Sequence, residues 1–525
     1  MWGKGFREDA WEKLGAPWDL VVVGGGITGA GIFAEATRAG FRTLLVEGGD
    51  FAQGTSSRST KLVHGGLRYL RQGQFLVTRK SVKERERMLD EGRGLVESLP
   101  FSLAAFPGDT MPRWMFGIGL SMYDALAWKW NHERLNEAEI VRLFPMLERS
   151  GVLGGYRYHD AQTDDARLTL RVLCEGVRRG GTARSYTRAV SLLRDTSGHV
   201  RGVVLRDERG PGKGRTAEVT AKAVINATGA WADELRKVLG EAPKLRKIRG
   251  SHLVFPRSKI PVTEAMSFMH PRDQRGVFAV PWEGVTLVGT TDVDHDHELD
   301  EEPRISSSEA DYILEGARKV FPGLGLVESD VLCTYSGVRP VIDTGKADPS
   351  KESREHAVWH EKGLVTITGG KLTTWALMAR EALEAARAEL GPLPDRTGMF
   401  DRGADETTLP SSLSQDVRRR LAGRLGEDAT KVVSSEADLE RIGDSISIYG
   451  ELRLAARDEG CVSLADLLLR RVRVGLTLPE GGRHEMAKIR ATVQPELGLS
   501  DAEWEAEEAE YLRTWRSAYA PPTGA

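Results

Sequence analysis

A dense group of hydroxyl and cationic side chains, followed by paired glycines, occupies residues 54–70. Hydroxyls, glycine backbone N–H groups and cations are donors that proteins use to bind phosphate oxygens. The segment therefore predicts a phosphate-binding loop. Its candidate ligands are Thr55, Ser56, Ser57, Ser59 and Lys61.

The loop follows a pattern typical of a dinucleotide site. A β-branched run at 19–23 enters Gly24, Gly26 and Gly29, and a helical pattern continues to about residue 40. In such units the first glycine makes a tight turn, the second lets backbone approach a pyrophosphate, and the third lets helix and strand pack closely. The helix N-terminus would then face the pyrophosphate.

A second predicted strand, 43–46, ends in Glu47. A carboxylate about 20 residues after the glycines can accept hydrogen bonds from both ribose hydroxyls, and it repels a 2′-phosphate, which disfavours NADP. This unit by itself leaves NAD and FAD both open.

Composition narrows the functional classes. The 525 residues carry 40% hydrophobic and 28% charged side chains with a net charge of −3, which disfavours a general nucleic-acid surface. Three scattered cysteines support no zinc site, iron–sulfur cluster or disulfide framework, so no metal site is predicted and a reducing cytoplasm is expected. The first residues lack the apolar core of a secretory signal, and export is not expected.

One apolar, aromatic run could meet a membrane without crossing it. Residues 114–123, followed by Trp128 and Trp130, fall short of the roughly 18 to 20 apolar residues that a span requires. An interfacial helix and a helix buried in the core are both compatible with this pattern.

The remaining patterns predict a mixed α/β chain with a helical tail. An amphipathic helix is predicted over 76–99, and short helices follow from about residue 405: 413–425, 437–442, 451–458, 464–469 and 504–515. Predicted strands form a meander at 189–193, 200–205 and 219–225, and an antiparallel platform at 251–255, 276–280 and 286–289. Small residues after the third meander strand, including Gly229, would let backbone approach a ligand.

Several separated motifs, in order, resemble the FAD-dependent glycerol-3-phosphate dehydrogenases of the aerobic, quinone-linked type. They are TSSRSTK at 55–61, GGLRY at 65–69, DDARL at 164–168, GSH at 250–252, YSGVRP at 335–340, GGKLTT at 369–374 and DLLLRR at 466–471. The chain departs from the family pattern at Glu35, at Ala39 and at Trp375-Ala376, which replaces a Tyr-Arg pair.

The resemblance implies a Rossmann-like doubly wound FAD-binding domain interleaved with an antiparallel β substrate domain, plus a C-terminal α-helical domain. We assign 17–100, 155–245 and 330–390 to the FAD-binding domain, 101–154 and 246–329 to the substrate domain, and 405–525 to the helical domain. FAD is expected to be non-covalent, bound by the loop residues above and by Gly24, Gly26, Gly29, Glu47, Val190, Gly229, Gly370 and Thr373.

The implied reaction is oxidation of sn-glycerol 3-phosphate to dihydroxyacetone phosphate, with hydride passing to flavin N5 and electrons to a membrane quinone. The catalytic residues implied are His252 as base, Arg339 and Lys371. Arg68, Tyr69 and Arg354 are expected to bind substrate, since arginine pairs with a phosphate dianion bidentately. His64 is the rival base, with its role left open.

Other functions stay open at this stage. They are an oxidase that passes electrons to oxygen, an amine or amino-acid oxidase of the same fold, and a flavin-binding sensor or scaffold. Quinone reduction would require peripheral contact with the inner face of the cytoplasmic membrane. A homodimer is the candidate assembly.

Overall fold

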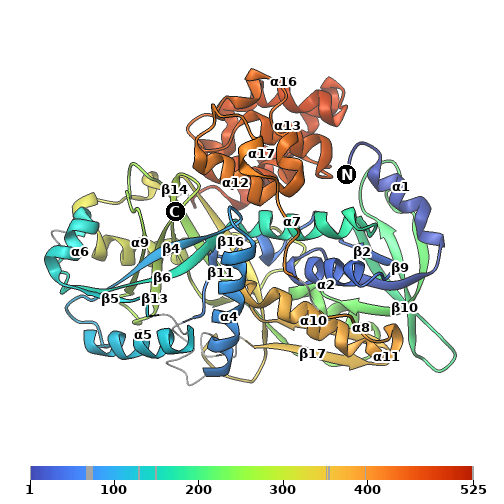
Figure 1. Cartoon of the computed structure of the whole chain (residues 1–525), viewed down its shortest axis with the longest axis horizontal. Helices are drawn as coiled ribbons and strands as arrows, with labels where there is room; N and C mark the ends of the chain where they lie inside the picture. Colours follow the sequence, from blue (N-terminus) through green and yellow to red (C-terminus); the bar gives the residue numbers. More distant parts are fainter. Residues whose placement is uncertain are drawn as a thin grey trace.

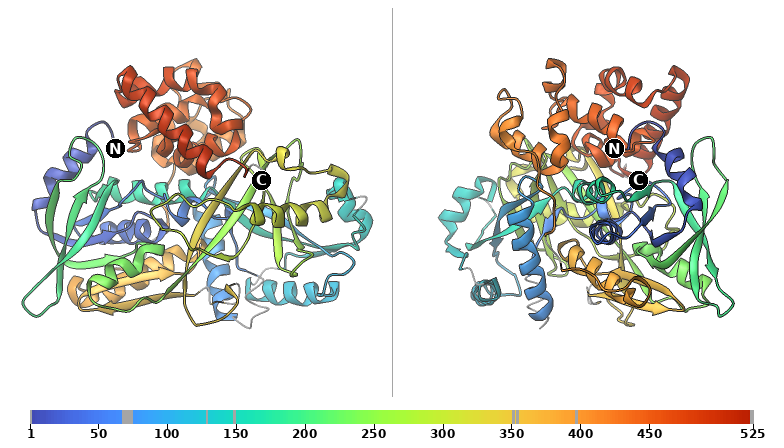
Figure 2. Two further views of the ribbon diagram at one scale, coloured as in Figure 1. Left: turned by 180° about the vertical axis from the view of Figure 1, so that it is seen from behind. Right: turned by 45° about the vertical axis from the view of Figure 1, so that its right-hand side comes forward.

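The computed structural model describes residues 2–66, 75–127, 130–147, 150–349, 352, 355–395 and 398–522. Two β-sheets with their covering helices lie side by side, and a helical domain formed by the last part of the chain rests on both (Figure 1). The turned views in Figure 2 keep this domain above the two sheets. The mixed α/β fold with a C-terminal helical domain is therefore as predicted.

The first sheet is the doubly wound one. Its order is β17-β18-β10-β1-β2-β7, in which β1, β2, β7, β10 and β18 run parallel. Val23 at the end of β1 lies beside Val46 of β2 and Asn226 of β10, so three carboxyl ends meet at one edge. The bounds are β1 (Trp18–Val23), β2 (Thr43–Val46), β7 (Thr182–Arg184), β10 (Thr216–Asn226), β17 (His356–Glu361) and β18 (Leu364–Gly369).

Helices cover one face of this sheet and a β-meander covers the other. Helices α2 (Ile27–Arg38), α7 (Asp165–Arg178) and α10 (Trp375–Ala385) bury their apolar sides in one core. On the opposite face, β8 (Thr187–Arg194) pairs with β9 (Val200–Asp207) and β9 pairs with β10, which confirms the predicted meander, beside α8 (Ala232–Val238). Helices α1 (Phe6–Glu12) and α11 (Arg387–Leu390) lie at the ends of this lobe.

The second sheet is mostly antiparallel and centres on a long strand pair. Strand β11 (Leu245–Pro256) pairs with β16 (Cys333–Ile342) from Leu245 opposite Ile342 to Val254 opposite Cys333. The predicted platform is confirmed by β11, β13 and β14. The other strands are β3 (Leu62–Val63), β4 (Val96–Ala104), β5 (Glu133–Leu135), β6 (Gly155–Thr163), β12 (Ala265–Met269), β13 (Gly276–Trp282), β14 (Val285–Gly289) and β15 (Val293–Asp294).

Four strands of the second sheet fall in ranges assigned to the FAD-binding domain. These are β3, β6 and β16, which lie wholly within those ranges, and β4, which begins in one and runs past its end, so the chain passes between the two sheets more often than the predicted ranges allow. One cause is the helix expected over 76–99, which was predicted too long. Helix α4 (Phe75–Glu91) ends before Gly94, whose φ of +81° suits glycine, and residues 96–104 form β4.

Helices α6 (Glu137–Leu143) and α9 (Ser307–Val320) cover one face of the second sheet. Helix α5 (Arg113–Ala127) packs against α4 at the rim. Within the described part of the chain, no helix combines the length and apolar character that a bilayer-spanning segment requires.

The C-terminal domain shares its core with the second sheet. Leu464, Leu467 and Leu468 pack in one apolar cluster with Trp282 and Tyr335. The main helices are α12 (Gln415–Leu425), α13 (Tyr449–Asp458), α16 (Met486–Leu497) and α17 (Asp501–Ala518), with short α14 (Leu464–Asp466) and α15 (Val474–Thr477) between them. Helix α16 was not predicted, and 437–442 contains only a 3-10 turn, Glu436–Leu439.

Gly176 tests how tightly the first lobe packs, and Gly119, in a helix beside the second sheet, is its control. A Cβ on Gly176 of α7 would lie 2.4 Å from the ring of Phe33 in α2, whereas a Cβ on Gly119 of α5 would meet nothing within 4 Å. We expect Gly176→Ala to lower the midpoint of thermal unfolding, through overpacking of about 1–3 kcal/mol. Gly119→Ala should raise it, since Ala favours a helix over Gly by up to ~1 kcal/mol. Equal effects of both substitutions would contradict this packing.

Glu283, at the turn between β13 and β14, ties the second sheet to the C-terminal domain. Its carboxylate accepts hydrogen bonds from Arg420 (3.0 Å) and Arg424 (3.1 Å). Burial opposes its ionisation, but these guanidinium groups outweigh burial and hold the pKa of Glu283 at about 2, against an ordinary 4.5.

This pair predicts an acid-sensitive contact. Because the folded pKa is depressed, the stabilisation is fully present above pH 4.5 and is lost as the pH falls toward about 2. Glu283→Gln should destabilise the protein by about 3 kcal/mol at neutral pH. The difference from the wild type in thermal unfolding should shrink between pH 4.5 and the lowest pH at which both fold. A constant difference across that range would contradict the assignment.

Candidate functional site

A cavity of about 1650 Å³ lies between the carboxyl edge of the first sheet and a face of the second. Such a volume exceeds the roughly 300–1,000 Å³ of an ordinary small-molecule pocket, so it can hold two ligands together. The predicted residues that line it are Gly24, Gly26, Glu47, Thr55, Ser56, Ser59, Val190, Gly229, Arg339, Gly370, Lys371 and Thr373.

The glycine turn leaves room for backbone contact at the cavity. Gly24 has φ +115°, and a Cβ there would lie 2.5 Å from the carbonyl oxygen of Ala227. Gly29 does not line the cavity; its Cβ would lie 1.9 Å from the Gly24 carbonyl oxygen, so it allows the close packing of helix and strand that the motif predicts. Gly26 caps α2, whose N-terminus faces the cavity.

Glu47 stands at the end of β2, where a ribose-binding carboxylate is expected. Its two oxygens accept hydrogen bonds from the backbone N–H groups of Gly25 (2.7 Å) and Gly49 (2.8 Å). Burial raises the pKa of Glu47. The N–H bonds fix the carboxylate at the cavity wall, so this end of the site fits the ribose of a dinucleotide such as FAD.

Some residues of the hydroxyl-rich loop line the cavity, and others do not. Thr55, Ser56 and Ser59 line the cavity, and the Ser56 hydroxyl accepts a hydrogen bond from Ile27 N–H in the first turn of α2 (2.9 Å). Ser57 and Lys61 do not line it. The Lys61 ammonium donates to the Ser57 carbonyl (2.6 Å) and to the carboxylate of Asp165 (2.8 Å).

The structure thus gives Lys61 a different role from the predicted cofactor contact. Asp165 is fully buried at the start of α7 and requires a cation, which Lys61 supplies. Burial, together with the charge of Arg473, lowers the pKa of Lys61 to about 8.

His252, the predicted base, does not itself line the cavity; Thr60, which does, is its hydrogen-bond partner. The His252 Nε2 is 2.9 Å from the hydroxyl of Thr60, and the imidazole ring stacks on Tyr335 at 4.6 Å. Burial and the charge of Arg339 hold the pKa of His252 well below its ordinary value. A neutral imidazole can accept a proton, and here a proton from the cavity would arrive through Thr60.

The rival histidine, His64, lines the cavity directly. Its backbone N–H donates to the Thr373 hydroxyl (3.1 Å), and burial lowers the pKa of the imidazole. Both histidines therefore remain candidates for the base.

Arg339 belongs to a charged group at the far end of the cavity. It donates to Asp292 (2.6 Å) and to the Thr290 hydroxyl (3.1 Å). Asp292 also binds Arg275 (2.8 Å), which lines the cavity as well. Sequence reasoning missed Arg275, because it follows a polar turn without a motif and meets Arg339 only through the folded sheet.

Lys371 stands between the first sheet and α4. Its ammonium donates to the Ser81 hydroxyl of α4 (3.1 Å), and burial lowers its pKa to about 7. A 3-10 turn, Leu372–Thr374, and then α10 follow directly, so Lys371 lies at the N-terminal end of this helical stretch. Arg68, Tyr69 and Arg354, the predicted substrate ligands, lie outside the described residues.

Two family models match the chain. One describes FAD-dependent oxidoreductases and matches residues 19–385; the other describes the C-terminal domain of α-glycerophosphate oxidase and matches 365–504. Similar curated proteins include the aerobic glycerol-3-phosphate dehydrogenases of Staphylococcus haemolyticus, 34% identical over 488 residues, and of Staphylococcus aureus, 35% identical over 485. Both alignments cover 86% of this chain and 86% of the relative.

Solved structures agree with these matches. Glycerol-3-phosphate dehydrogenase from Bacillus halodurans, complexed with FAD, aligns with a TM-score of 0.80 and 28% identity over 100% of both chains. L-α-glycerophosphate oxidase from Mycoplasma pneumoniae shares the fold, with a TM-score of 0.57 and 18% identity over 71% of this chain and 95% of that one.

The glycine turn, the Glu47 carboxylate and the cavity that both line fit FAD, and the relatives agree in fold and cofactor. The chain is an FAD-dependent oxidoreductase and belongs to the aerobic glycerol-3-phosphate dehydrogenase family.

Proposed function

We propose that the chain oxidises sn-glycerol 3-phosphate to dihydroxyacetone phosphate and passes the electrons to a membrane quinone. The observation that carries this proposal is the continuity of one cavity from the glycine turn of the first sheet to the arginines of the second. One end suits a dinucleotide, and the other presents cations to a phosphate dianion.

Different residues of the site are assigned to substrate binding and to proton transfer. Oxidation at C2 removes a hydride from carbon and a proton from the 2-hydroxyl, and bound FAD supplies the hydride acceptor at N5. Arg339, supported by Arg275 across Asp292, is the candidate phosphate ligand. The proton goes to a neutral histidine, either His252 through Thr60 or His64 directly.

Lys371 is the candidate stabiliser of negative charge. With a pKa of about 7, its ammonium can be charged near neutral pH, and it stands just before the turn that starts α10. Charge at this position would stabilise an anion developing beside it.

Arg339 tests the substrate assignment. We expect Arg339→Gln to raise KM for sn-glycerol 3-phosphate by about 10- to 100-fold, the loss of a charge-assisted hydrogen bond of roughly 1.5–3 kcal/mol. KM is measured from the steady-state rate of reduction of an added electron-acceptor dye against substrate concentration, and anaerobic bleaching of the flavin absorbance shows whether the substrate reduces the flavin.

Arg246 offers the matched control. It forms a comparable pair with Asp294 (2.6 Å) on the same sheet and does not line the cavity. Arg246→Gln should keep the wild-type KM. If the wild type were not bleached by sn-glycerol 3-phosphate, or if both variants behaved alike, the substrate assignment would fail.

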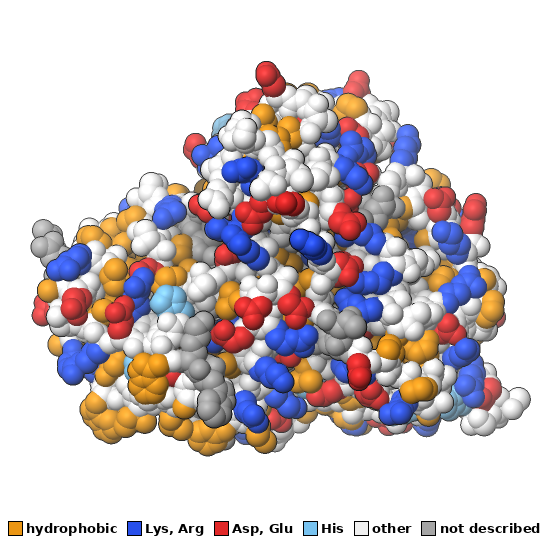
Figure 3. Space-filling view, viewed as in Figure 1, with side chains coloured by type: hydrophobic (Ala, Val, Ile, Leu, Met, Phe, Trp, Pro, Cys, Tyr) orange, Lys and Arg blue, Asp and Glu red, His pale blue; other side chains and the backbone are white. Residues whose placement is uncertain are grey.

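Helix α5 carries the proposed contact with the inner face of the cytoplasmic membrane. Its buried side includes Phe116 and Tyr123, whereas Trp114 is 63% and Ile118 54% exposed, so one face belongs to the core and the other is exposed, as an interfacial helix would require. Figure 3 shows hydrophobic side chains gathered over this helix. Exposed aromatic and aliphatic residues on one helix face suit the headgroup boundary of a bilayer.

The exposed face continues into the cavity. Met115, Ile118 and Met122 are exposed and also line the cavity. An apolar quinone could therefore leave the bilayer and approach the site along α5, which supports quinone rather than oxygen as the acceptor.

Two exposed tryptophans test this contact without altering the cavity. Trp114 and Trp130 are 63% and 71% exposed and do not line the cavity. We expect Trp114→Ser/Trp130→Ser to reduce binding to anionic phospholipid vesicles and reduction of vesicle-embedded quinone, while bleaching by substrate persists.

Val327→Ser, at an exposed apolar residue away from α5, is the control and should bind vesicles normally. Unchanged vesicle binding by the double variant would exclude the α5 contact. Peroxide formation in place of quinone reduction by the wild type would identify an oxidase.

A further inference from the structure

The loop of residues 49–61 faces the cavity on one side and the C-terminal domain on the other. We infer that the C-terminal domain is a positioning part of the FAD site, through the segment Leu467–Arg473 and through Tyr519, with Arg473 as the principal residue. The inference rests on FAD binding in the cavity and does not depend on the substrate or the electron acceptor.

Asp50 provides the first point of attachment. Its fully buried carboxylate accepts hydrogen bonds from Arg470 and from both terminal nitrogens of Arg471, one of them at 2.8 Å. Two residues on, the N–H of Ala52 donates to the carbonyl of Gly25 in the glycine turn (3.0 Å). The contact from the C-terminal domain therefore reaches the turn through a short, buried path.

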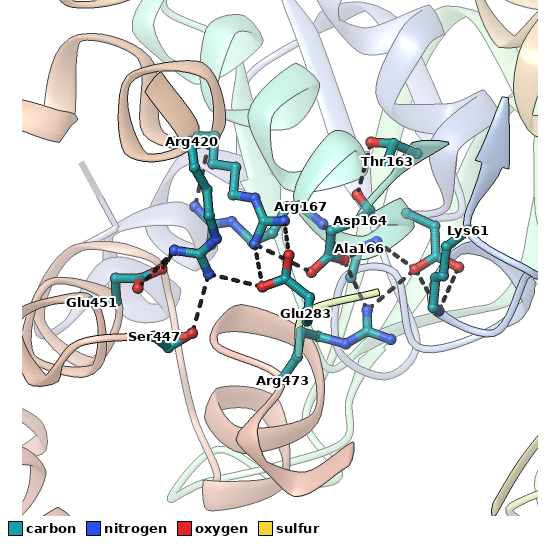
Figure 4. Close-up of polar contacts among 12 residues, drawn as sticks. Lys61, Thr163, Asp164, Ala166, Arg167, Glu283, Arg420, Ser447, Glu451 and Arg473 are labelled. Atoms are coloured by element: carbon teal, nitrogen blue, oxygen red, sulfur yellow. Dashed lines mark hydrogen bonds and ion pairs between the residues drawn. The ribbon is translucent and has the colours of Figure 1, made fainter. Parts of the chain in front are cut away.

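Arg473 provides the second point of attachment, and the close-up in Figure 4 shows it beside Asp164 and Lys61. Its side chain, 1% exposed, donates to the Ser57 carbonyl (2.8 Å) and lies 3.2 Å from the Asp165 carboxylate. These are the same two acceptors that Lys61 uses.

Asp165 connects Arg473 to Ser59, a residue of the cavity wall. Its carboxylate accepts hydrogen bonds from the Ser59 N–H (2.8 Å) and the Ser59 hydroxyl (2.7 Å). Ser59 lines the cavity, so its orientation depends on a carboxylate held between Lys61 and Arg473.

A third attachment comes from Tyr519 near the end of the chain. Its hydroxyl donates to Glu302 (2.6 Å), which is also the partner of Arg58 (2.5 Å). Arg58 lines the cavity from the same loop. Each of the three attachments supports a loop residue next to, or on, the cavity wall.

The backbone of the segment is specialised for these contacts. Residues Leu467–Arg471 form a π-helical turn, and Arg473 has φ +68°, in the left-handed region that a non-glycine residue seldom adopts. Surrounding structure must maintain such a conformation, and here it places three arginines on two buried carboxylate sites. A loop held in its binding conformation before FAD arrives loses less freedom on binding, which tightens the complex.

Arg473→Gln tests the inference. Starting from the holoenzyme, dilution into FAD-free buffer and the rise of free-flavin fluorescence give the rate of FAD release. We expect release at least about tenfold faster than in the wild type, together with a changed visible flavin spectrum and faster hydrogen exchange at Ser57 and Ser59.

Arg420→Gln is the matched control. Arg420 of the C-terminal domain has only 11% of its side chain exposed and binds Glu283 (3.0 Å) and Glu451 (2.9 Å), but none of its hydrogen bonds or ion pairs is to residues 49–61. It should lower thermal stability and leave FAD release and the spectrum unchanged. If both variants released FAD in proportion to their lost stability, or if Arg473→Gln released it at the wild-type rate, the inference would be overturned.

Tyr519→Phe covers the case in which Arg473→Gln does not fold. It deletes one hydroxyl from the third attachment and keeps the ring, so folding should be preserved. We expect a smaller, measurable increase in FAD release and faster exchange at Arg58. Release and exchange both identical to the wild type would count against the inference.

Discussion

Much of this structure depends on one interaction, the pairing of the buried Asp165 carboxylate with the cations of Lys61 and Arg473. A charge removed from water must be paired and hydrogen-bonded to be tolerated, and breaking such a pair costs more than the pair contributes. Here three partners come from two distant parts of the chain: Lys61 and Ser59 from the loop, and Arg473 from the C-terminal domain. Burial opposes the ionisation of Asp165, but Lys61 and Arg473 lower its pKa. One side chain thus fixes the start of α7, the cavity wall and the domain above it.

The local parts of the site were predictable because their chemistry lies within short stretches of sequence. Gly24, Gly26 and Gly29 are separated by a few residues, and Glu47 follows the next strand, so the turn, the helix start and a carboxylate at the cavity wall follow from spacing. The resemblance identified the motifs that approach them from elsewhere, including Arg339 and Lys371.

The other parts of the site could not be predicted, because they depend on contacts between residues that are far apart in the chain. The cation partner of Asp165 is Lys61, 104 residues earlier, and nothing in the loop distinguishes this lysine from a phosphate ligand. Arg275 reaches Arg339 only because β13 and β16 flank the same part of the second sheet and Asp292 lies between them. The end of α4 was misjudged because charged residues continue past Glu91, whereas Gly92 and Gly94 break the helix.

The repeated passage of the chain between the two sheets explains why residues of both line one cavity. Strand β3 belongs to the second sheet, yet it follows directly from the loop whose other end touches the glycine turn of the first. Strand β16 likewise carries Arg339 and packs against β18, which leads to Lys371. Strands of the two sheets that carry residues of the cavity wall therefore lie in contact with each other. A displacement of either sheet would separate them, and the C-terminal domain, in contact with both, opposes that displacement through Glu283 on one side and Asp165 on the other.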